Sequence, residues 1–157
     1  SGTENLFGAI ALCLALEKYS VKTELDERFT VQKNMTSSFI RELRNIPSCS
    51  IIPASRQDPL YCDASGYDTR FSPWIIQAAF EGIPSEVLVR SLSEKGLYIS
   101  TGSACSSRKL SRPVLEAMNV SREHIASAVR FSFGYTTKES EISILLDTLK
   151  DVVKIFS

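Results

Sequence analysis

Residues 128–133 read Ala-Val-Arg-Phe-Ser-Phe, an alternation that predicts a half-buried β-strand. In such a strand Arg130 and Ser132 share one face, and the two phenylalanines share the other. From about residue 138 to 155 the apolar side chains recur at spacings of three and four, which predicts an amphipathic helix. Because the strand and the helix each have one apolar surface to bury, this stretch predicts a layered α/β domain.

The remaining segments extend the same pattern toward the N-terminus. We predict strands at 49–52, 73–80 and 97–100, and helices at 24–45, 84–95 and 113–118. Between them, the stretch 54–69 is rich in Pro, Asp, Ser and Gly and predicts a long loop. Strands separated by helices give, as the simplest architecture, a two-layer α/β sandwich in which a small, mostly antiparallel sheet packs against helices.

The first helix is predicted to begin at Thr3, as its cap, and to continue to about Tyr19. It is apolar nearly all round, so we expect it to be buried between layers. Its apolar run, 6–16, is shorter than the roughly 20 residues of a membrane span, and we expect no membrane association. The chain is thus divided into a linking helix, 1–20, and a small domain, 21–157.

The composition is that of one globular domain. Of the 157 residues, 43% are hydrophobic and 23% are charged, and 18 basic side chains balance 18 acidic ones. These values exclude an intrinsically disordered chain, a collagen-like fibre and a strongly electrostatic nucleic-acid binder. The four cysteines have neither the density of a disulfide scaffold nor the spacing of a zinc site, so we expect reduced thiols in a cytoplasmic protein.

Cys105 is the first candidate for chemistry. It lies in the segment 100–109, Ser-Thr-Gly-Ser-Ala-Cys-Ser-Ser-Arg-Lys, where small residues make an open loop and two nearby cations favour the thiolate. Local chemistry gives equal weight to a nucleophile and to an ordinary small loop residue. Of the other cysteines, Cys13 and Cys49 are predicted to be core residues, and Cys62, in the long loop, is left open.

Arg130 is the second candidate, at the end of the predicted strand and beside a glycine-containing turn. Its planar guanidinium can bind a carboxylate through two parallel hydrogen bonds. The alternative, of even weight, is that it pairs with a surface acidic residue. His124 is the only histidine, and we interpret it as an exposed structural residue, so no metal site is predicted.

Three segments together resemble one family. Residues 1–5 read Ser-Gly-Thr-Glu-Asn, residues 100–107 resemble a Ser-x-Gly-Ser-Ala-Cys loop, and residues 130–137 read Arg-Phe-Ser-Phe-Gly-Tyr-Thr-Thr. In this order they resemble the motifs of the C-terminal, small domain of the pyridoxal-phosphate-dependent cysteine desulfurases, in the class V aminotransferase-like family. The Ser-Ala-Cys version is similar to the subgroup with the longer cysteine loop.

This resemblance implies the C-terminal domain of a pyridoxal-phosphate-dependent transferase fold and a sulfur-transfer activity. Cys105 would take sulfur from L-cysteine, leaving L-alanine and an enzyme persulfide. Arg130 would bind the substrate carboxylate, and Thr3 would donate to the phosphate of pyridoxal 5′-phosphate across the interface of a homodimer. The persulfide would pass to a sulfur-acceptor or iron–sulfur scaffold protein, for cluster assembly or for thiolation of a cofactor or tRNA. One thiolate is too little to predict a bound cluster.

The chain departs from this family in what it lacks. The family's cofactor lysine follows a histidine in the large domain, and no lysine here follows His124. We therefore expect the large, cofactor-binding domain to be absent from this chain, and the chain alone to be inactive. The segment before Trp74 also lacks the family's usual Asn-x-Ser-Phe pattern. Two alternatives stay open: a non-catalytic domain that binds sulfur-acceptor or scaffold proteins, and a related lyase or aminotransferase in which Cys105 is dispensable.

Overall fold

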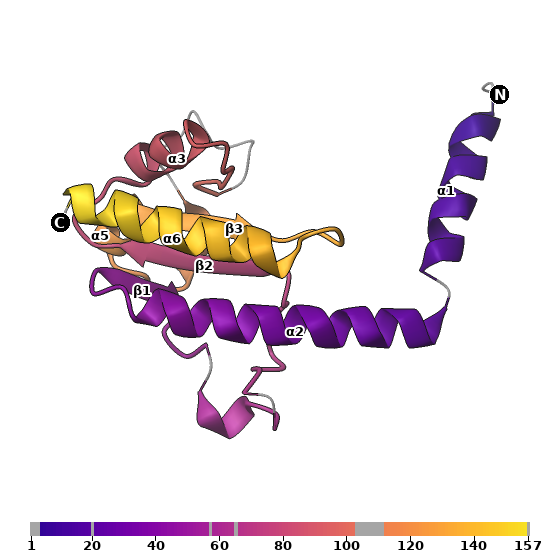
Figure 1. Cartoon of the computed structure of the whole chain (residues 1–157), viewed down its shortest axis with the longest axis horizontal. Coiled ribbons are helices and arrows are strands. Elements are labelled where there is room, and N and C mark those ends of the chain that lie inside the picture. Colours follow the sequence, from indigo (N-terminus) through magenta and orange to yellow (C-terminus); the bar gives the residue numbers. More distant parts are fainter. Residues whose placement is uncertain (1–3, 20, 57, 65, 103–111, 157) are drawn as a thin grey trace.

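The computed structural model describes residues 4–19, 21–56, 58–64, 66–102 and 112–156. Helices pack on a three-stranded antiparallel sheet, and the first helix stands away from them (Figure 1). The predicted fold class, a small antiparallel sheet packed with helices, is confirmed. The elements are α1 (Leu6–Lys18), α2 (Lys22–Arg44), β1 (Cys49–Ile52), η1 (Pro59–Tyr61), β2 (Ile75–Phe80), α3 (Ser85–Ser93), α4 (Pro113–Ala117), α5 (Arg122–Ser127), β3 (Ala128–Ser132) and α6 (Glu139–Phe156).

The sheet has the strand order β1-β2-β3, with β2 antiparallel to both neighbours. Cys49 lies opposite Phe80 in the first pair, and Ile75 lies opposite Ser132 in the second. The alternation predicted for β3 is confirmed, because Val129 and Phe131 are buried while Ser132 is exposed. The register therefore gives the sheet one apolar face and one face of mixed character.

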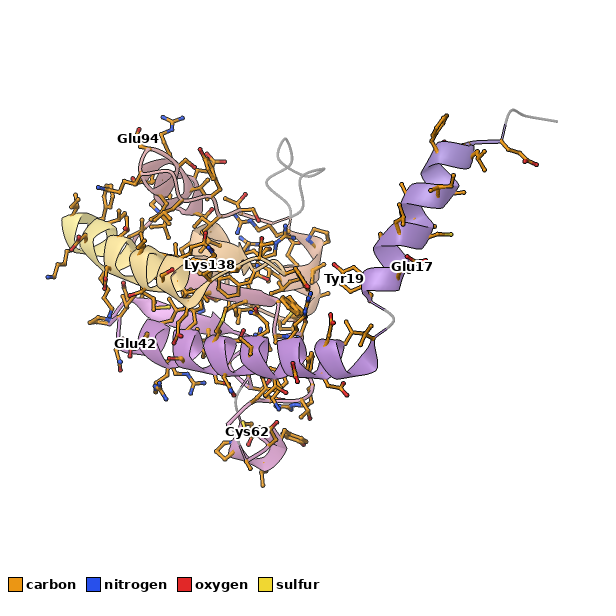
Figure 2. The ribbon with its side chains drawn as sticks, turned by 45° about the vertical axis from the view of Figure 1, so that its right-hand side comes forward. Glu17, Tyr19, Glu42, Cys62, Glu94 and Lys138 are labelled. Atoms are coloured by element: carbon orange, nitrogen blue, oxygen red, sulfur yellow. The ribbon has the colours of Figure 1, made fainter. Side chains whose placement is uncertain are left out.

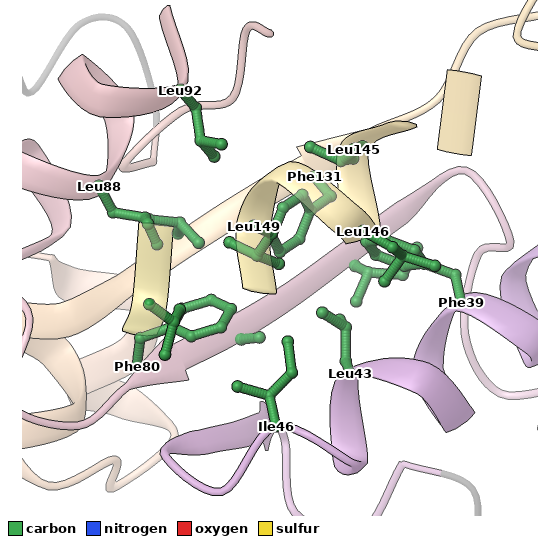
Figure 3. Packing of buried hydrophobic residues seen from close by; sticks show 14 of the residues in the cluster. Phe39, Leu43, Ile46, Phe80, Leu88, Leu92, Phe131, Leu145, Leu146 and Leu149 are labelled. Carbon is green, nitrogen blue, oxygen red and sulfur yellow. The ribbon is translucent and has the colours of Figure 1, made fainter. Parts of the chain in front are cut away.

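The apolar face carries the main hydrophobic core, which is covered by α2, α3 and α6 (Figure 3). Phe39 of α2 is completely buried, and its ring packs edge-on against Phe131, with centroids 5.1 Å apart, and against Phe133, at 5.3 Å. The apolar stripe predicted for the last helix is confirmed as its buried side, except at its final member, Phe156, which is exposed. The buried members are Ile142, Leu145, Leu146, Leu149, Val152 and Val153.

The opposite face of the sheet is covered only in part. Ile52, Ala79 and Ala128 form a small buried cluster with Leu115 of α4. Farther along the same face, Ile75 and Ser132 are exposed. One end of this face is therefore closed by α4 and α5, and the other end is open.

The helix α1 lies outside the core, so the prediction that it is buried between layers is wrong. The exposed fractions of its large apolar residues range from 49% for Ile10 to 87% for Phe7. Figure 2 shows the helix projecting from the rest of the domain. Asn5, rather than Thr3, caps it, because the Asn5 side chain accepts a hydrogen bond from the Gly8 N–H at 2.9 Å. Among the helices of the described segments, none is long and apolar enough to cross a membrane.

The segment 97–100 does not form the predicted fourth strand. Of these four described residues, Ser100 alone pairs, in a single antiparallel bridge with Arg130. The reason lies at the end of α3, where Gly96 adopts a positive φ of 77° and the Leu97 N–H donates to the Leu92 carbonyl at 3.0 Å. Part of the segment predicted to be a strand therefore terminates the helix α3 instead.

The predicted loop after β1 is confirmed as irregular structure that contains the short helix η1. It is attached firmly to the domain. The Arg56 guanidinium, only 5% exposed, donates to the carbonyls of Ile75, at 2.8 Å, and Ser72, at 2.9 Å. Lys33 of α2 forms an ion pair with Asp63 at 2.5 Å. This segment therefore has a defined position beside α2 (Figure 2).

Candidate functional site

Arg130 lies in the middle of β3, between two partners, and not at the end of a strand as predicted. On one side it faces Gln77 of β2, and on the other side it pairs with Ser100. The Arg130 N–H donates to the Ser100 carbonyl at 2.6 Å, and the Ser100 N–H donates to the Arg130 carbonyl at 3.1 Å. Ile52 of β1 lies opposite Gln77. We call these four residues, Ile52, Gln77, Arg130 and Ser100, the Arg130 row.

The side chains of the Arg130 row share the partly covered face, because residues directly opposite each other in antiparallel pairs point to the same side. Ile52 is buried at the covered end, whereas Gln77, Arg130 and Ser100 are half-buried. The row therefore marks the border between the part of the face closed by α4 and the open part.

The hydrogen bonding of its guanidinium within the described part of the chain distinguishes Arg130 from the other partly buried arginines. Its Nε atom is buried and has no hydrogen-bond partner among the described residues. Within the same part of the chain, none of the ion pairs includes Arg130. The alternative interpretation, pairing with a surface acidic residue, is thus not observed there. A buried N–H of a permanent cation without a partner indicates an anion-binding position.

A second arginine, Arg112, is hydrogen-bonded to the start of β3. The Arg112 guanidinium donates to the Ala128 carbonyl at 2.6 Å and to the Ser85 hydroxyl at 2.7 Å, and burial lowers the pKa of Arg112. Ser100 and Arg112, which lie on either side of residues 103–111, are therefore both hydrogen-bonded to β3. This role of Arg112 was not predicted, because no pattern in the sequence indicates which groups its guanidinium contacts.

Two of the three predicted site residues, Cys105 and Thr3, lie outside the described residues. The structure therefore places Arg130 and adds Gln77 and Ser100 beside it. Gln77 was missed because the sequence predicts that 73–80 is a strand but does not specify which residue of another strand it faces. The signal that could have found it is its polarity within an otherwise apolar strand.

The three described cysteines are free thiols with different surroundings. Cys49 is half-buried, as predicted for a core residue, and burial raises its pKa to about 12. The pKa of Cys62 is also raised, by burial and then by the carboxylates of Asp68, Asp63 and Asp58. Cys13 is exposed on α1, so its predicted place in the core is wrong. Neither half-buried thiol is activated as a nucleophile, since both pKa values move away from neutrality.

The residues near Arg130 do not fit pyridoxal 5′-phosphate by themselves. In the family that the motifs resemble, a lysine holds this cofactor, and the described part of this sheet face offers no lysine. Its residues are Ser50, Ile52, Ile75, Gln77, Ala79, Ser100, Ala128, Arg130 and Ser132. They fit a carboxylate. In addition, no group of three or more His, Cys, Asp or Glu side chains among the described residues could hold a metal ion.

Comparison with known proteins agrees with the motifs. The chain matches the model of the class-V aminotransferase family over residues 1–145. It is 31% identical to the cysteine desulfurase IscS of Dictyoglomus turgidum over 156 residues, covering 98% of this chain and 36% of that protein. Its fold is similar to that of a NifS-like protein, with a TM-score of 0.74 and 24% identity, over 99% of this chain and 35% of the other. It is also similar to a C-DES mutant with glycine covalently linked to the pyridoxal phosphate cofactor, with a TM-score of 0.51 and 18% identity, over 88% of this chain and 26% of that one.

The chain therefore belongs to the class-V aminotransferase family. Named relatives that it matches along nearly its whole length are cysteine desulfurases. It spans about a third of the length of these relatives, at 36%, 35% and 35%.

Proposed function

We propose that this chain is the small domain of a cysteine desulfurase, in which Arg130 binds the α-carboxylate of L-cysteine. The observation that carries this proposal is the buried, unpartnered Nε of Arg130 at the border of an open sheet face. A guanidinium can donate from Nε and one Nη to both oxygens of a carboxylate. Leaving such an N–H buried and unsatisfied costs about 1–3 kcal/mol, which a bound carboxylate would recover.

We assign the sulfur-accepting role to Cys105, because the segment around it resembles the cysteine loop of the cysteine desulfurases. Its thiolate would attack the sulfur of L-cysteine, so that an S–S bond forms and the C–S bond breaks with its electrons staying on carbon. That carbon then takes a proton, and the products are L-alanine and a Cys105 persulfide. The cofactor, held by the large domain, would supply an electron sink for the substrate carbon. Ser100, five residues before Cys105, is hydrogen-bonded to Arg130, which supports a site shared by the two segments.

We further propose a division into a linking segment, 1–20, and a small domain, 21–157, that together complete a homodimeric enzyme with a large, pyridoxal-phosphate-binding domain. The exposed apolar side chains of α1 support this division, because they need a covering partner. Thr3 would donate to the cofactor phosphate of the other subunit. The persulfide would serve a sulfur-acceptor or iron–sulfur scaffold protein, in iron–sulfur cluster assembly or thiolation of a cofactor or tRNA. The free cysteines support a reducing, cytoplasmic compartment.

The test uses the complete enzyme, meaning this chain together with its large domain, and measures alanine formation from L-cysteine. Arg130→Ala is expected to raise KM at least about tenfold, because a hydrogen-bonded charge contributes roughly 1.5–3 kcal/mol. Cys105→Ala is expected to abolish persulfide formation, and the isolated chain is expected to be inactive. Ser132→Ala, on the same strand face, is the matched control and should leave KM within about twofold. Alanine formation that is unaffected by Arg130→Ala would contradict the proposal.

A further inference from the structure

We propose that Gln77 is a second binding residue for the carboxylate that Arg130 holds, donating to it from its side-chain amide. This inference rests on the proposed function of Arg130 and extends it. It comes from the strand register, which the sequence does not reveal. The two residues are direct cross-strand partners in the β2–β3 pair.

The hydrogen-bond pattern brings these two side chains close together. The N–H and carbonyl of Arg130 are both used by Ser100, so they point away from β2. Gln77 and Arg130 therefore form a non-hydrogen-bonded pair, the type in which opposite side chains lie nearest, with Cβ atoms about 5 Å apart. The Phe133 N–H donates to the Trp74 carbonyl at 2.8 Å, as this alternation requires.

The surroundings of Gln77 restrict where its amide can make hydrogen bonds. Its other cross-strand partner, Ile52, is 5% exposed and has an apolar side chain. Its neighbours on the same face of β2, Ile75 and Ala79, are apolar as well. Apart from the Ser50 hydroxyl, which lies diagonally across β1, a half-buried amide at this position meets polar groups only on the Arg130 side or beyond the open face.

A carboxylate bound to Arg130 would provide a hydrogen-bond acceptor for both the Arg130 guanidinium and the Gln77 amide. It would accept hydrogen bonds from the unpartnered Nε of Arg130, and its remaining lone pairs would accept from the Gln77 amide N–H. Ile75 and Ala79 provide no competing acceptor. The Arg130 row therefore selects a small molecule with a free carboxylate. Arg130 supplies the positive charge, and the Gln77 amide orients the carboxylate by donating a hydrogen bond to it.

Substitutions at Gln77 in the complete enzyme test this inference. Gln77→Leu removes the donor at similar volume and is expected to raise KM for L-cysteine about tenfold, with kcat within about threefold. Gln77→Glu is expected to raise KM more, because a carboxylate side chain repels the substrate carboxylate. Gln77→Asn keeps the amide and should recover a KM between those of Gln77→Leu and the unaltered protein. Ser132→Ala is again the control.

The outcomes separate this inference from the proposed function. If Arg130→Ala raises KM while Gln77→Leu and Gln77→Glu both stay within twofold of the unaltered protein, Arg130 acts alone and the Gln77 inference is wrong. If Arg130→Ala has no effect, the proposed function itself fails. A folding defect is recognised by thermal unfolding, and it would lower kcat and the melting temperature together without a selective change in KM. Such a result for Gln77→Asn as well as Gln77→Leu would mean that Gln77 is structural, which overturns the inference.

Discussion

Arg56, Arg112 and Arg130 are all at least partly buried, yet their hydrogen bonds differ. Arg56 and Arg112 each donate to two acceptors within the domain, whereas Nε of Arg130 has none among the described residues. Burial of a satisfied guanidinium contributes to the fold, but burial of an unsatisfied one opposes it. The difference supports the proposal that Arg130 is retained for binding a carboxylate.

This contrast predicts opposite effects of one substitution on stability. In the isolated chain, Arg56→Met is expected to lower the free energy of unfolding by about 2–4 kcal/mol, because two carbonyl groups lose their donors. Arg130→Met is expected to leave it unchanged or to raise it by up to about 1 kcal/mol, because no described partner of Nε is lost. Urea unfolding measures both. A loss for Arg130→Met as large as that for Arg56→Met would show that Arg130 has a structural partner.

At the scale of elements, the sequence predicted what periodicity encodes and missed what depends on partners. The strand β3 and the helix α6 were predicted because their apolar spacing matches one face of each element. The segment 97–100 has strand-like composition, but its first residue, Leu97, is hydrogen-bonded to the end of α3 after the turn at Gly96. The Arg130–Gln77 pair depends on register, which emerges only when β2 and β3 meet. Arg130 could thus be proposed from sequence, and Gln77 could not.

The attachment of α2 to Pro73, two residues before β2, provides a prediction at this scale. The Thr36 hydroxyl is fully buried, donates to the Pro73 carbonyl at 2.5 Å and accepts from the Gln32 amide at 3.1 Å. Thr36→Val keeps the volume and removes both hydrogen bonds, so the free energy of unfolding should fall by about 1–3 kcal/mol. The fluorescence of Trp74, the single tryptophan, can follow denaturant unfolding.

The matched control for this prediction lies on the same helix. The Thr30 hydroxyl is exposed and donates to the Asp26 carbonyl. Thr30→Val should change the free energy of unfolding by no more than about 0.5 kcal/mol. Equal effects of the two substitutions would mean that the buried hydrogen bonds do not hold α2 against the segment before β2.

At the scale of the whole molecule, α1 exposes its apolar side chains, whereas the remainder of the chain has a buried core. The main core is complete without α1, while the helix exposes Leu6, Phe7, Leu12, Leu14 and Leu16 by more than half of their surface. The balanced charge, 18 basic against 18 acidic residues, offers little repulsion to oppose association through such a surface. The sequence prediction of burial failed because apolarity indicates that a surface needs covering, without indicating that the same chain covers it.

Cys13 provides a probe of what covers α1. It is exposed on this helix, so alkylation should modify it readily in the isolated chain. If α1 is covered in the complete enzyme, as we propose, the rate of Cys13 modification should fall at least about tenfold there, because a buried thiol is shielded from the reagent. Cys49, with a pKa raised to about 12 by burial, is the internal reference and should react slowly in both samples. Mass spectrometry of the modified peptides measures each rate. Equal modification of Cys13 in the two samples would show that α1 stays exposed in the complete enzyme and that the proposed role of residues 1–20 is wrong.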